Sequence, residues 1–194
     1  MKVAIIRYNA GNTRSVLNSL SRLGVEASVT DDADAIARAD RVIFPGVGEA
    51  SSAMAYLRER SLDSVILSLR QPVLGVCLGM QLLCRSSEEN DAVCLDILPG
   101  RARRFPDGGV KVPHVGWNAV QKLNSPLFAG VPDGSYVYFV HSYYVEPGAH
   151  SVAEADHGVR FSAAAHCGNF YAVQFHPERS GAVGERILKN FLEI

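Results

Sequence analysis

Cys77 is the residue in this sequence whose surroundings point most directly to chemistry. It stands in GVCLGMQ, residues 75–81, between two glycines and directly after an apolar run. A strand, a tight G-x-C-x-G turn and a helix form the nucleophile-elbow pattern, here with Cys in place of Ser. Such a turn forces its central residue toward positive φ, and Gly75 and Gly79 remove side chains that would collide beside it. A helix beginning near Leu78 would direct free N–H groups at the sulfur, which favours the thiolate.

Cys77 has three other interpretations: half of a disulfide, a metal ligand, or a small buried side chain. The four cysteines, at positions 77, 84, 94 and 167, form no C-x-x-C pair and show no Cys/His spacing typical of zinc. If Cys77 and Cys84 share a helix, a rise of about 1.5 Å per residue separates them by roughly 10 Å, too far for a disulfide. A buried side chain and a nucleophile both remain open. The sequence predicts neither a metal site nor a cofactor.

His176 is the histidine best placed to act as the base that a nucleophile needs. It follows the apolar run YAVQF and precedes Pro177 and Glu178. Alternate residues of an extended chain project to the same side, and proline disfavours a helical residue before it, so His176 and Glu178 can point together. The carboxylate then accepts from one ring nitrogen and leaves the other free to take the thiol proton. From the tripeptide alone, a strand-end histidine beside a surface glutamate remains the alternative. Of the other histidines, we expect His166 to have a structural role, and His150 and His157 to be exposed.

Taken together, these motifs resemble the class I, or triad, glutamine amidotransferases over essentially the whole chain. GVCLGMQ matches their nucleophile motif, FHPE (residues 175–178) their His/Glu motif, and PGVG (residues 45–48) the loop that supplies an oxyanion donor. The resemblance implies a catalytic triad of Cys77, His176 and Glu178. Cys77 would attack the side-chain amide of glutamine, His176 would protonate the departing ammonia, and water would hydrolyse the glutamyl thioester.

The same resemblance implies contacts with the oxyanion and the substrate. The N–H groups of Val47 and Leu78 would hold the oxyanion. Because glycine visits both signs of φ, the Val47 peptide could flip between its flanking glycines and switch this site on or off. A plain strand-to-helix turn remains the alternative for PGVG, and a solvated or capping role remains open for Gln81. The implied substrate contacts are Gly46, Gly48, Gly79, Gln81, Ser142 and Tyr143.

Three further segments indicate which group of class I amidotransferases this chain resembles most. KVPHVGWN (residues 111–118), YFVHSYY (residues 138–144) and the N-terminal AGNTRSV are similar to signatures of the glutaminase subunits of imidazole glycerol phosphate synthase. This implies a heterodimer with a (β/α)₈-barrel cyclase, which uses the ammonia to make imidazole glycerol phosphate and aminoimidazole carboxamide ribotide in histidine biosynthesis. Another class I glutaminase with a different synthase and a non-catalytic scaffold are the alternatives, and core packing is the alternative for Trp117. The implied interface residues are Asn12, Lys111, His114, Trp117, Asn118 and Tyr138.

One short segment departs from the family, whose members usually read D-Y-G where this chain has Arg7, Tyr8 and Asn9. A positive charge thus replaces an acid at a strand end near the expected interface. The change concerns contacts that the acid would make with the partner or the PGVG loop, and it leaves the triad intact. Asn tolerates positive φ better than most residues, so the turn can persist.

Length and charge limit the partners of this chain. It has 194 residues and a formal net charge of −1, which argues against nucleic acid or an anionic membrane as the main partner. Its apolar runs are shorter than the ~18 residues that span a bilayer, and the run at the N-terminus is too short for a signal peptide, so we expect a cytoplasmic protein. The densest basic run should be a solvated loop or the rim of a protein contact. This run consists of Arg101, Arg103 and Arg104.

An α/β fold would bring these residues together. The first half alternates apolar, strand-like runs with amphipathic segments, which is typical of βαβ units in a mostly parallel open sheet with helices on both faces. The second half adds strand-like pieces joined by glycine and proline turns, which predicts antiparallel strands. We expect a single domain, residues 1–194, with Asn12 capping the first helix and Gly24 ending it. The expected strands are 2–8, 25–30, 41–44, 72–76, 110–120, 136–147, 151–156, 159–167 and 169–175. The expected helices are 13–23, 32–39, 77–85 and 182–194, and residues 53–70 should form one or two more.

Overall fold

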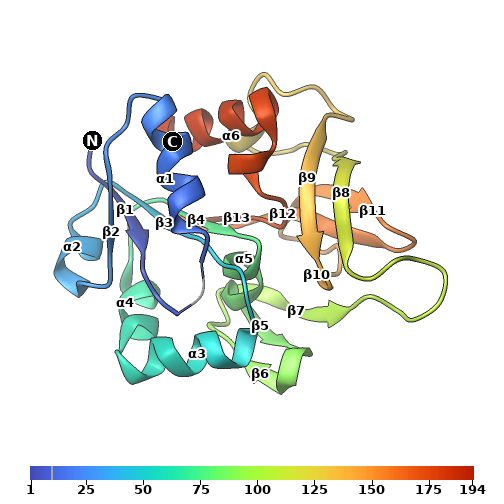
Figure 1. Ribbon diagram of the computed structural model, residues 1–194, viewed down its shortest axis with the longest axis horizontal. Coiled ribbons are helices and arrows are strands. Elements are labelled where there is room, and N and C mark those ends of the chain that lie inside the picture. The colour runs from blue at the N-terminus through green and yellow to red at the C-terminus, as the bar shows by residue number, and fades with distance from the viewer. Residues whose placement is uncertain (10) are drawn as a thin grey trace.

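The computed structural model describes residues 1–9 and 11–194, and its centre is a seven-stranded sheet (Figure 1). Five neighbouring strands run parallel: β13 (Phe170–Val173), β4 (Val73–Val76), β3 (Arg41–Phe44), β1 (Val3–Ile6) and β2 (Ala27–Thr30). At the β13 edge, antiparallel pairing adds β12 (Arg160–Cys167) and β11 (Ser151–Asp156). The predicted α/β fold, a mostly parallel sheet with antiparallel strands from the second half, is confirmed.

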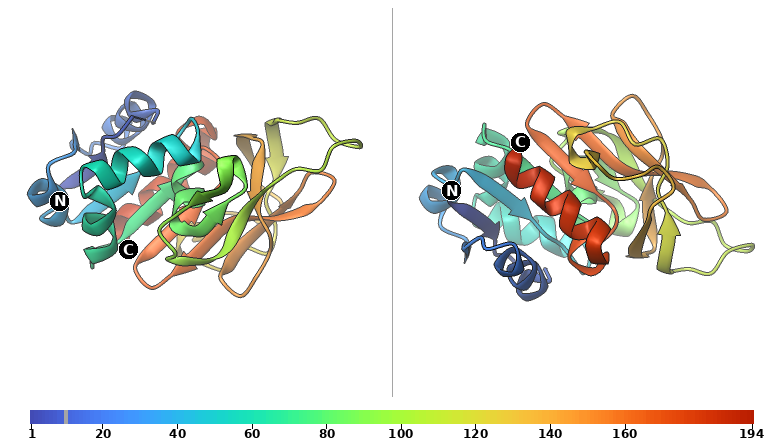
Figure 2. Two further views of the ribbon diagram at one scale, coloured as in Figure 1. Left: turned by 90° about the horizontal axis from the view of Figure 1, so that it is seen from below. Right: turned by 90° about the horizontal axis from the view of Figure 1, so that it is seen from above.

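Helices cover both faces of this sheet. On one face lie α1 (Thr13–Arg22) and α6 (Gly181–Glu193), and on the other lie α2 (Ala33–Ala37), α3 (Ala50–Glu59), α4 (Leu62–Ser68) and α5 (Leu78–Leu83). Figure 2 shows α3 in front when the molecule is seen from below and α6 in front when it is seen from above. Alternate residues of β1 divide between the two cores: Ile5 packs with the α1 and α6 side, and Ile6 with the opposite side. Burial on both faces explains why β1, β3, β4 and β13 are mainly apolar runs in the sequence, whereas the edge strand β2 is only partly buried.

Residues 84–145 form two smaller sheets beside the central one (Figure 1). A four-stranded sheet has the order β10 (Tyr143–Val145), β7 (Leu98–Arg104), β5 (Cys84–Ser87) and β6 (Ala92–Val93), and an antiparallel pair is formed by β8 (His114–Ala119) and β9 (Tyr136–His141). Three short 3₁₀ turns complete the elements: η1 (Glu89–Asp91), η2 (Pro126–Phe128) and η3 (Pro177–Arg179). None of the helices within the described residues is both long and apolar enough to cross a membrane.

The basic run lies on strand β7, and its prediction as a loop was wrong. Ala102 is fully buried between Arg101 and Arg103, so the strand alternates between an inward alanine and outward arginines. The arginines are exposed and lie near carboxylates of Glu88 and Glu146, with Arg103 Nη1 2.8 Å from Glu146 Oε1. One small inward residue among charges gave too weak an apolar signal to indicate a strand.

The ends of α1 agree in part with the sequence. Gly24 follows the helix with a φ of 74°, the conformation expected of a glycine that ends a helix. Asn12 occupies the N-cap position, but its side chain caps no backbone N–H and instead accepts a hydrogen bond from Ser15 Oγ at 2.8 Å. The helix therefore begins where expected, with a different hydrogen bond at its first turn.

Candidate active site

Cys77 lies on the turn between β4 and α5, at the carboxyl edge of the parallel strands. Its φ is 54° and its ψ is −108°, a conformation that costs a non-glycine residue about 1–3 kcal/mol. A Cβ added to Gly75 would lie 3.1 Å from the backbone carbon and oxygen of Gly79, which agrees with the predicted crowding. A Cβ on Gly79 would collide more severely, with the backbone oxygen of Phe44 on β3. The second glycine is thus required mainly by the neighbouring strand.

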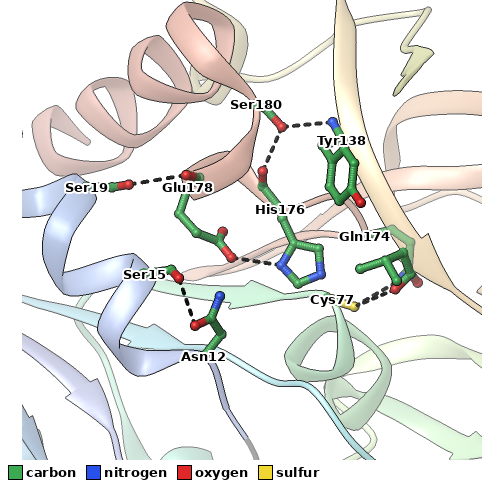
Figure 3. Close-up of polar contacts among 10 residues, drawn as sticks. Asn12, Ser15, Ser19, Cys77, Tyr138, Gln174, His176, Glu178 and Ser180 are labelled. Carbon is green, nitrogen blue, oxygen red and sulfur yellow. Dashed lines mark hydrogen bonds and ion pairs between the residues drawn. The ribbon is translucent and has the colours of Figure 1, made fainter. Parts of the chain in front are cut away.

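His176 and Glu178 lie together just after β13, as the sequence predicted, but Glu178 belongs to the 3₁₀ turn η3 rather than to an extended chain (Figure 3). The Nδ1 atom of His176 is 2.8 Å from Glu178 Oε1, and both side chains are almost fully buried. The backbone of this segment is held against β9, because the N–H of His176 donates to Tyr138 O at 2.9 Å. Ser180 Oγ joins the same two residues, donating to His176 O at 2.6 Å and accepting from the Tyr138 N–H at 2.9 Å.

One nitrogen of the His176 imidazole is hydrogen-bonded to Glu178, and the other has no hydrogen-bond partner among the described residues. Glu178 accepts from Nδ1, whereas the other nitrogen, Nε2, is buried. Figure 3 shows this nitrogen facing the sulfur of Cys77. Burial lowers the pKa of His176, but its interactions with Cys77 and Glu178 outweigh burial and raise that pKa to about 10. The site therefore favours a protonated ring, the form that can give a proton to a leaving group.

A cavity of about 300 Å³ opens beside the sulfur, a size at the lower end of the range for small-molecule sites. Four of the six predicted substrate contacts line it, together with Val47 and Leu78. Gly46 and Gly79 are instead buried where the PGVG loop meets α5; a Cβ on Gly46 would lie 2.6 Å from Leu78 Cβ. Both positions, predicted to contact substrate, require glycine because of the close packing behind the cavity wall. The residues lining the cavity are Val47, Gly48, Cys77, Leu78, Gln81, Glu89, Pro113, Val140, His141, Ser142 and Tyr143.

The predicted oxyanion donors are not both available in this structure. The N–H of Leu78 donates to the carbonyl oxygen of Gly46 at 3.3 Å. The peptide between Gly46 and Val47 thus presents its oxygen, rather than its N–H, to the start of α5. Val47 is 40% exposed and Gly48 has a φ of 119°, so the loop is little constrained on its outer side. An oxyanion hole at Val47 and Leu78 requires this peptide to turn over.

The unusual residues at the end of β1 have partners within the chain. Arg7 Nη2 lies 2.6 Å from Asp31 Oδ1, and their hydrogen bond raises the pKa of Arg7 and lowers that of Asp31. Asn9 Nδ2 donates to the backbone oxygen of Ser52 at 3.2 Å. Tyr8 donates its hydroxyl to Pro45 O at 2.6 Å, which anchors the start of the PGVG loop.

Two further residues near the sulfur were missed from the sequence. Glu89 lines the cavity, and burial raises the pKa of its carboxyl group although the Ala50 N–H donates to it at 2.8 Å. Gln174 is fully buried, and its Nε2 donates to Cys77 Sγ at 3.7 Å. A polar residue inside the apolar run FYAVQF was a signal for Gln174, whereas Glu89 stands in the polar segment SSEEND and gave none.

His114 and Asn118, both predicted at the partner interface, are directed inward in the chain. The ring of His114 is buried, stacks on the His157 ring with centroids 4.1 Å apart, and has its Nδ1 3.0 Å from Nε2 of His141. Asn118 Nδ2 donates to Asp156 O at 2.7 Å. Because side chains alternate along β8, these two residues occupy its inner face while Trp117 faces outward. His157, expected to be exposed, is half-buried by this stack, and His150 is half-buried as well.

The buried imidazoles predict that the chain loses stability in acid. Burial lowers the pKa of His114 to about 4 and that of His141 to about 3. An unfolded histidine, with a pKa near ~6.5, takes up a proton below that pH while these rings stay neutral. The unfolded state then binds more protons, so the free energy of unfolding should fall as the pH drops from ~6.5 to ~4, by up to roughly 1.4 kcal/mol per pH unit for each ring.

Urea unfolding followed by circular dichroism at several pH values in this range measures the effect. His141→Asn places its amide nitrogen close to the position of Nδ1 and can still donate to Tyr143 O, so it should fold and show a shallower pH dependence than the parent. His150→Asn, outside this pair of rings, should keep the parent slope. Equal slopes for the parent and His141→Asn would show that the buried rings do not cause the loss.

Comparison with known proteins gives the same family throughout the chain. A model of the family "Glutamine amidotransferase class-I" matches residues 4–194. The protein named imidazole glycerol phosphate synthase subunit HisH from Bacteroides fragilis is 57% identical over 196 residues, covering 100% of both chains. The protein of the same name from Haemophilus influenzae is 49% identical over 194 residues, covering 100% of this chain and 98% of that protein.

Solved structures agree with this at the level of the fold. A crystal structure of a glutamine amidotransferase has a TM-score of 0.76 at 19% identity, covering 98% of this chain and 97% of that one. PurLQS from Thermotoga maritima has a TM-score of 0.74 at 18% identity, with coverage of 99% and 97%. The chain belongs to the class I glutamine amidotransferases and, within them, to the HisH subunits of imidazole glycerol phosphate synthase.

Proposed function

We propose that the chain is the glutaminase subunit of imidazole glycerol phosphate synthase, which hydrolyses glutamine to glutamate and ammonia and passes the ammonia to a cyclase subunit. The observation that supports this most is the juxtaposition of Cys77, which lines the cavity, with His176 and Glu178, in a chain of this family. A nucleophile, a base and a group that orients the base are the minimum that acyl transfer through a thioester requires.

The reaction begins when the Cys77 thiolate attacks the side-chain amide carbon of glutamine. Protonated His176 gives its Nε2 proton to the departing nitrogen, so ammonia leaves and a glutamyl thioester remains. The neutral ring then takes a proton from water, which attacks the thioester and releases glutamate and the thiolate. Glu178 holds the ring with Nδ1 protonated, which keeps Nε2 directed at the reacting atoms.

The oxyanion formed in each attack needs donors that are turned away in this structure. Leu78 N–H would exchange Gly46 O for the oxyanion, and a flip of the peptide before Val47 would bring in a second N–H. Each donor of this kind contributes about 3–4 kcal/mol to lowering the barrier. The flip therefore acts as a switch, and a partner that favours the flipped peptide activates the glutaminase.

The cavity wall carries groups suited to the amino-acid end of glutamine. Gln81 uses both of its N–H bonds within the protein, one to Tyr143 O and one to Gln174 Oε1, each at 3.1 Å. Only its Oε1 is left for a ligand, and this acceptor, together with the carboxylate of Glu89, suits the substrate ammonium group. Backbone groups of Ser142 and Tyr143 complete this side of the cavity.

The outer face of β8 and β9 is the surface that we assign to the cyclase. Trp117 is 55% and Val115 52% exposed, and Trp117 contacts Tyr138 on β9 with ring centroids 6.0 Å apart. Val140, at the end of this face, also lines the cavity, so a partner docked here would lie next to the place where ammonia is released. Lys111 is exposed next to this face, and Asn12 is half-buried at the start of α1. A (β/α)₈ barrel is the partner we propose.

Glutamate release is expected to be slow for the isolated chain and to rise sharply when the cyclase subunit and its nucleotide substrate are added. The physical reason is the Gly46 carbonyl, which occupies the Leu78 N–H until the loop changes. An enzyme-coupled glutamate assay with the chain alone, the purified complex, and the complex with nucleotide measures the three rates.

Two results would contradict the assignment. Full activity of the lone chain would show that the oxyanion site needs no partner. Failure to co-purify with the cyclase, together with ammonia transfer to a different acceptor, would point to another class I synthase.

A further inference from the structure

Gln174 is a buried amide that the mechanism above does not use. It follows β13 directly, and its backbone N–H donates to Ala163 O at 2.9 Å. Its side chain is 0% exposed and lies between Gln81, whose Nε2 donates to Gln174 Oε1 at 3.1 Å, and Cys77, whose Sγ accepts from Gln174 Nε2 at 3.7 Å. Burying an amide is unfavourable unless both of its ends are paired, so these two contacts need an explanation.

A backbone carbonyl decides which end of Gln174 faces the sulfur. Tyr143 O can only accept, and it lies 3.1 Å from the amide nitrogen of Gln81 and 2.7 Å from Nδ1 of His141. Gln81 must therefore present its nitrogen to this carbonyl, and the second N–H of that nitrogen is left for Gln174 Oε1. It follows that Gln174 presents its own N–H, and not its oxygen, to Cys77.

The N–H of Gln174 beside Cys77 Sγ stabilises the thiolate more than the neutral thiol. Among the described residues, Cys77 Sγ is the only acceptor for Gln174 Nε2. A neutral thiol accepts weakly, whereas a thiolate accepts a strong, charge-assisted hydrogen bond. The neutral thiol can instead donate to Val140 O at 3.7 Å, a contact that ionisation removes. The N–H of Gln174 that faces the sulfur is thus well paired only when the sulfur carries a negative charge.

We propose that Gln174 is a catalytic hydrogen-bond donor to the Cys77 thiolate, and that Gln81 and the Tyr143 carbonyl are the groups that position it. Figure 3 shows the side chains of Gln174 and His176 both directed at the sulfur. Gln174 lies outside the set of residues that line the cavity, so it acts on the nucleophile and leaves substrate binding to others. This inference rests on the proposed cysteine chemistry, but the alkylation and NMR experiments below need neither glutamine nor a partner.

The pH dependence of Cys77 alkylation by iodoacetamide, measured by mass spectrometry of the full chain, tests the proposal. Only the thiolate reacts, so the rate reports its population. Gln174→Met keeps the length of the side chain and removes the donor. We expect it to slow alkylation at pH 7 about tenfold and to raise the pH midpoint by about one unit. Gln71→Met is the matched control, because Gln71 donates to Ile36 O at 3.0 Å, at the opposite end of β4, and it should keep the parent profile.

Two additional measurements separate this role from simple core filling. Gln81→Met should shift the midpoint in the same direction, and the double variant should shift it no further than Gln174→Met, because both residues act through one contact. In the complex, Gln174→Met should lower kcat for glutamine hydrolysis with KM retained. A folded Gln174→Met variant with the parent alkylation profile would overturn the proposal.

The unsubstituted chain provides a test that does not depend on any variant folding. The side-chain amide resonance of Gln174 should titrate with the same pH midpoint as Cys77 alkylation, and a resonance that does not move would also overturn the proposal. If the midpoint shifts as expected but the complex fails to hydrolyse glutamine, the donor role stands and the proposed function is wrong.

Discussion

Cys77→Ala is expected to abolish glutamine-dependent synthesis by the complex while added ammonium still supports the cyclase. Among the residues that the structure describes, Cys77 is the one thiol on the cavity wall, and it faces His176; without its sulfur no thioester can form. Loss of a nucleophile that works as a unit with its base lowers kcat by a factor on the order of 10⁴ or more. Ammonium bypasses this step because it supplies the product of the glutaminase directly.

Product formation with glutamine and with ammonium, measured on the same preparation, distinguishes the two subunits' contributions. Cys167→Ala is the matched control, because Cys167 is a free, half-buried cysteine at the end of β12, and it should retain both activities. Equal loss with both nitrogen sources in Cys77→Ala would contradict the division of labour. It would indicate that the substitution disturbs the partner or the assembly.

Gly79→Ala is expected to cost stability and glutaminase activity together. The added methyl group would collide with the backbone oxygen of Phe44, and a strand buried between two helical layers cannot move away easily. Overpacking of this kind costs about 1–3 kcal/mol, and more where the obstacle is backbone. Either α5 moves, which displaces Cys77 and Leu78, or β3 moves, which displaces the PGVG loop that follows it.

Urea unfolding and glutamate release by the complex together test this expectation. Gly148→Ala is the control, because a Cβ there meets no atom within 4 Å and the residue lacks a positive φ, so the change should stay within about 0.5 kcal/mol. A Gly79→Ala chain with parental stability and parental activity would show that the contact between α5 and β3 is looser than the distances indicate.

Much of the fold was predictable because its signals are local. The inner parallel strands are mainly apolar runs, since both of their faces are buried, and the helices between them show apolar residues at helical spacing. Strand β7 was missed because it is not an apolar run. It buries Ala102 and exposes arginines on both sides, so its alternation carries almost no apolar signal.

The same distinction holds at the site. His176 and Glu178 are two residues apart in the sequence, so their contact is local, although Glu178 lies in the 3₁₀ turn η3 and not on the extended segment that the sequence predicted. The contact of Gln174 with Cys77, the place of Glu89 on the cavity wall and the inward direction of His114 depend on how distant segments pack. For His114 the alternation along β8 was visible, but which of its two faces would be covered was not.

The sequence by itself determined the elbow at Cys77, the pairing of His176 with Glu178 and the layered α/β arrangement, because each depends on residues within one turn, one strand or one helix. The tertiary structure alone decided that Leu78 N–H is occupied by Gly46 O, and that a buried amide donates to the sulfur. Hydrogen-bond partners of this kind come from segments far apart along the chain. Local patterns of residue type limit which groups can donate or accept, but only packing brings a particular donor to a particular acceptor.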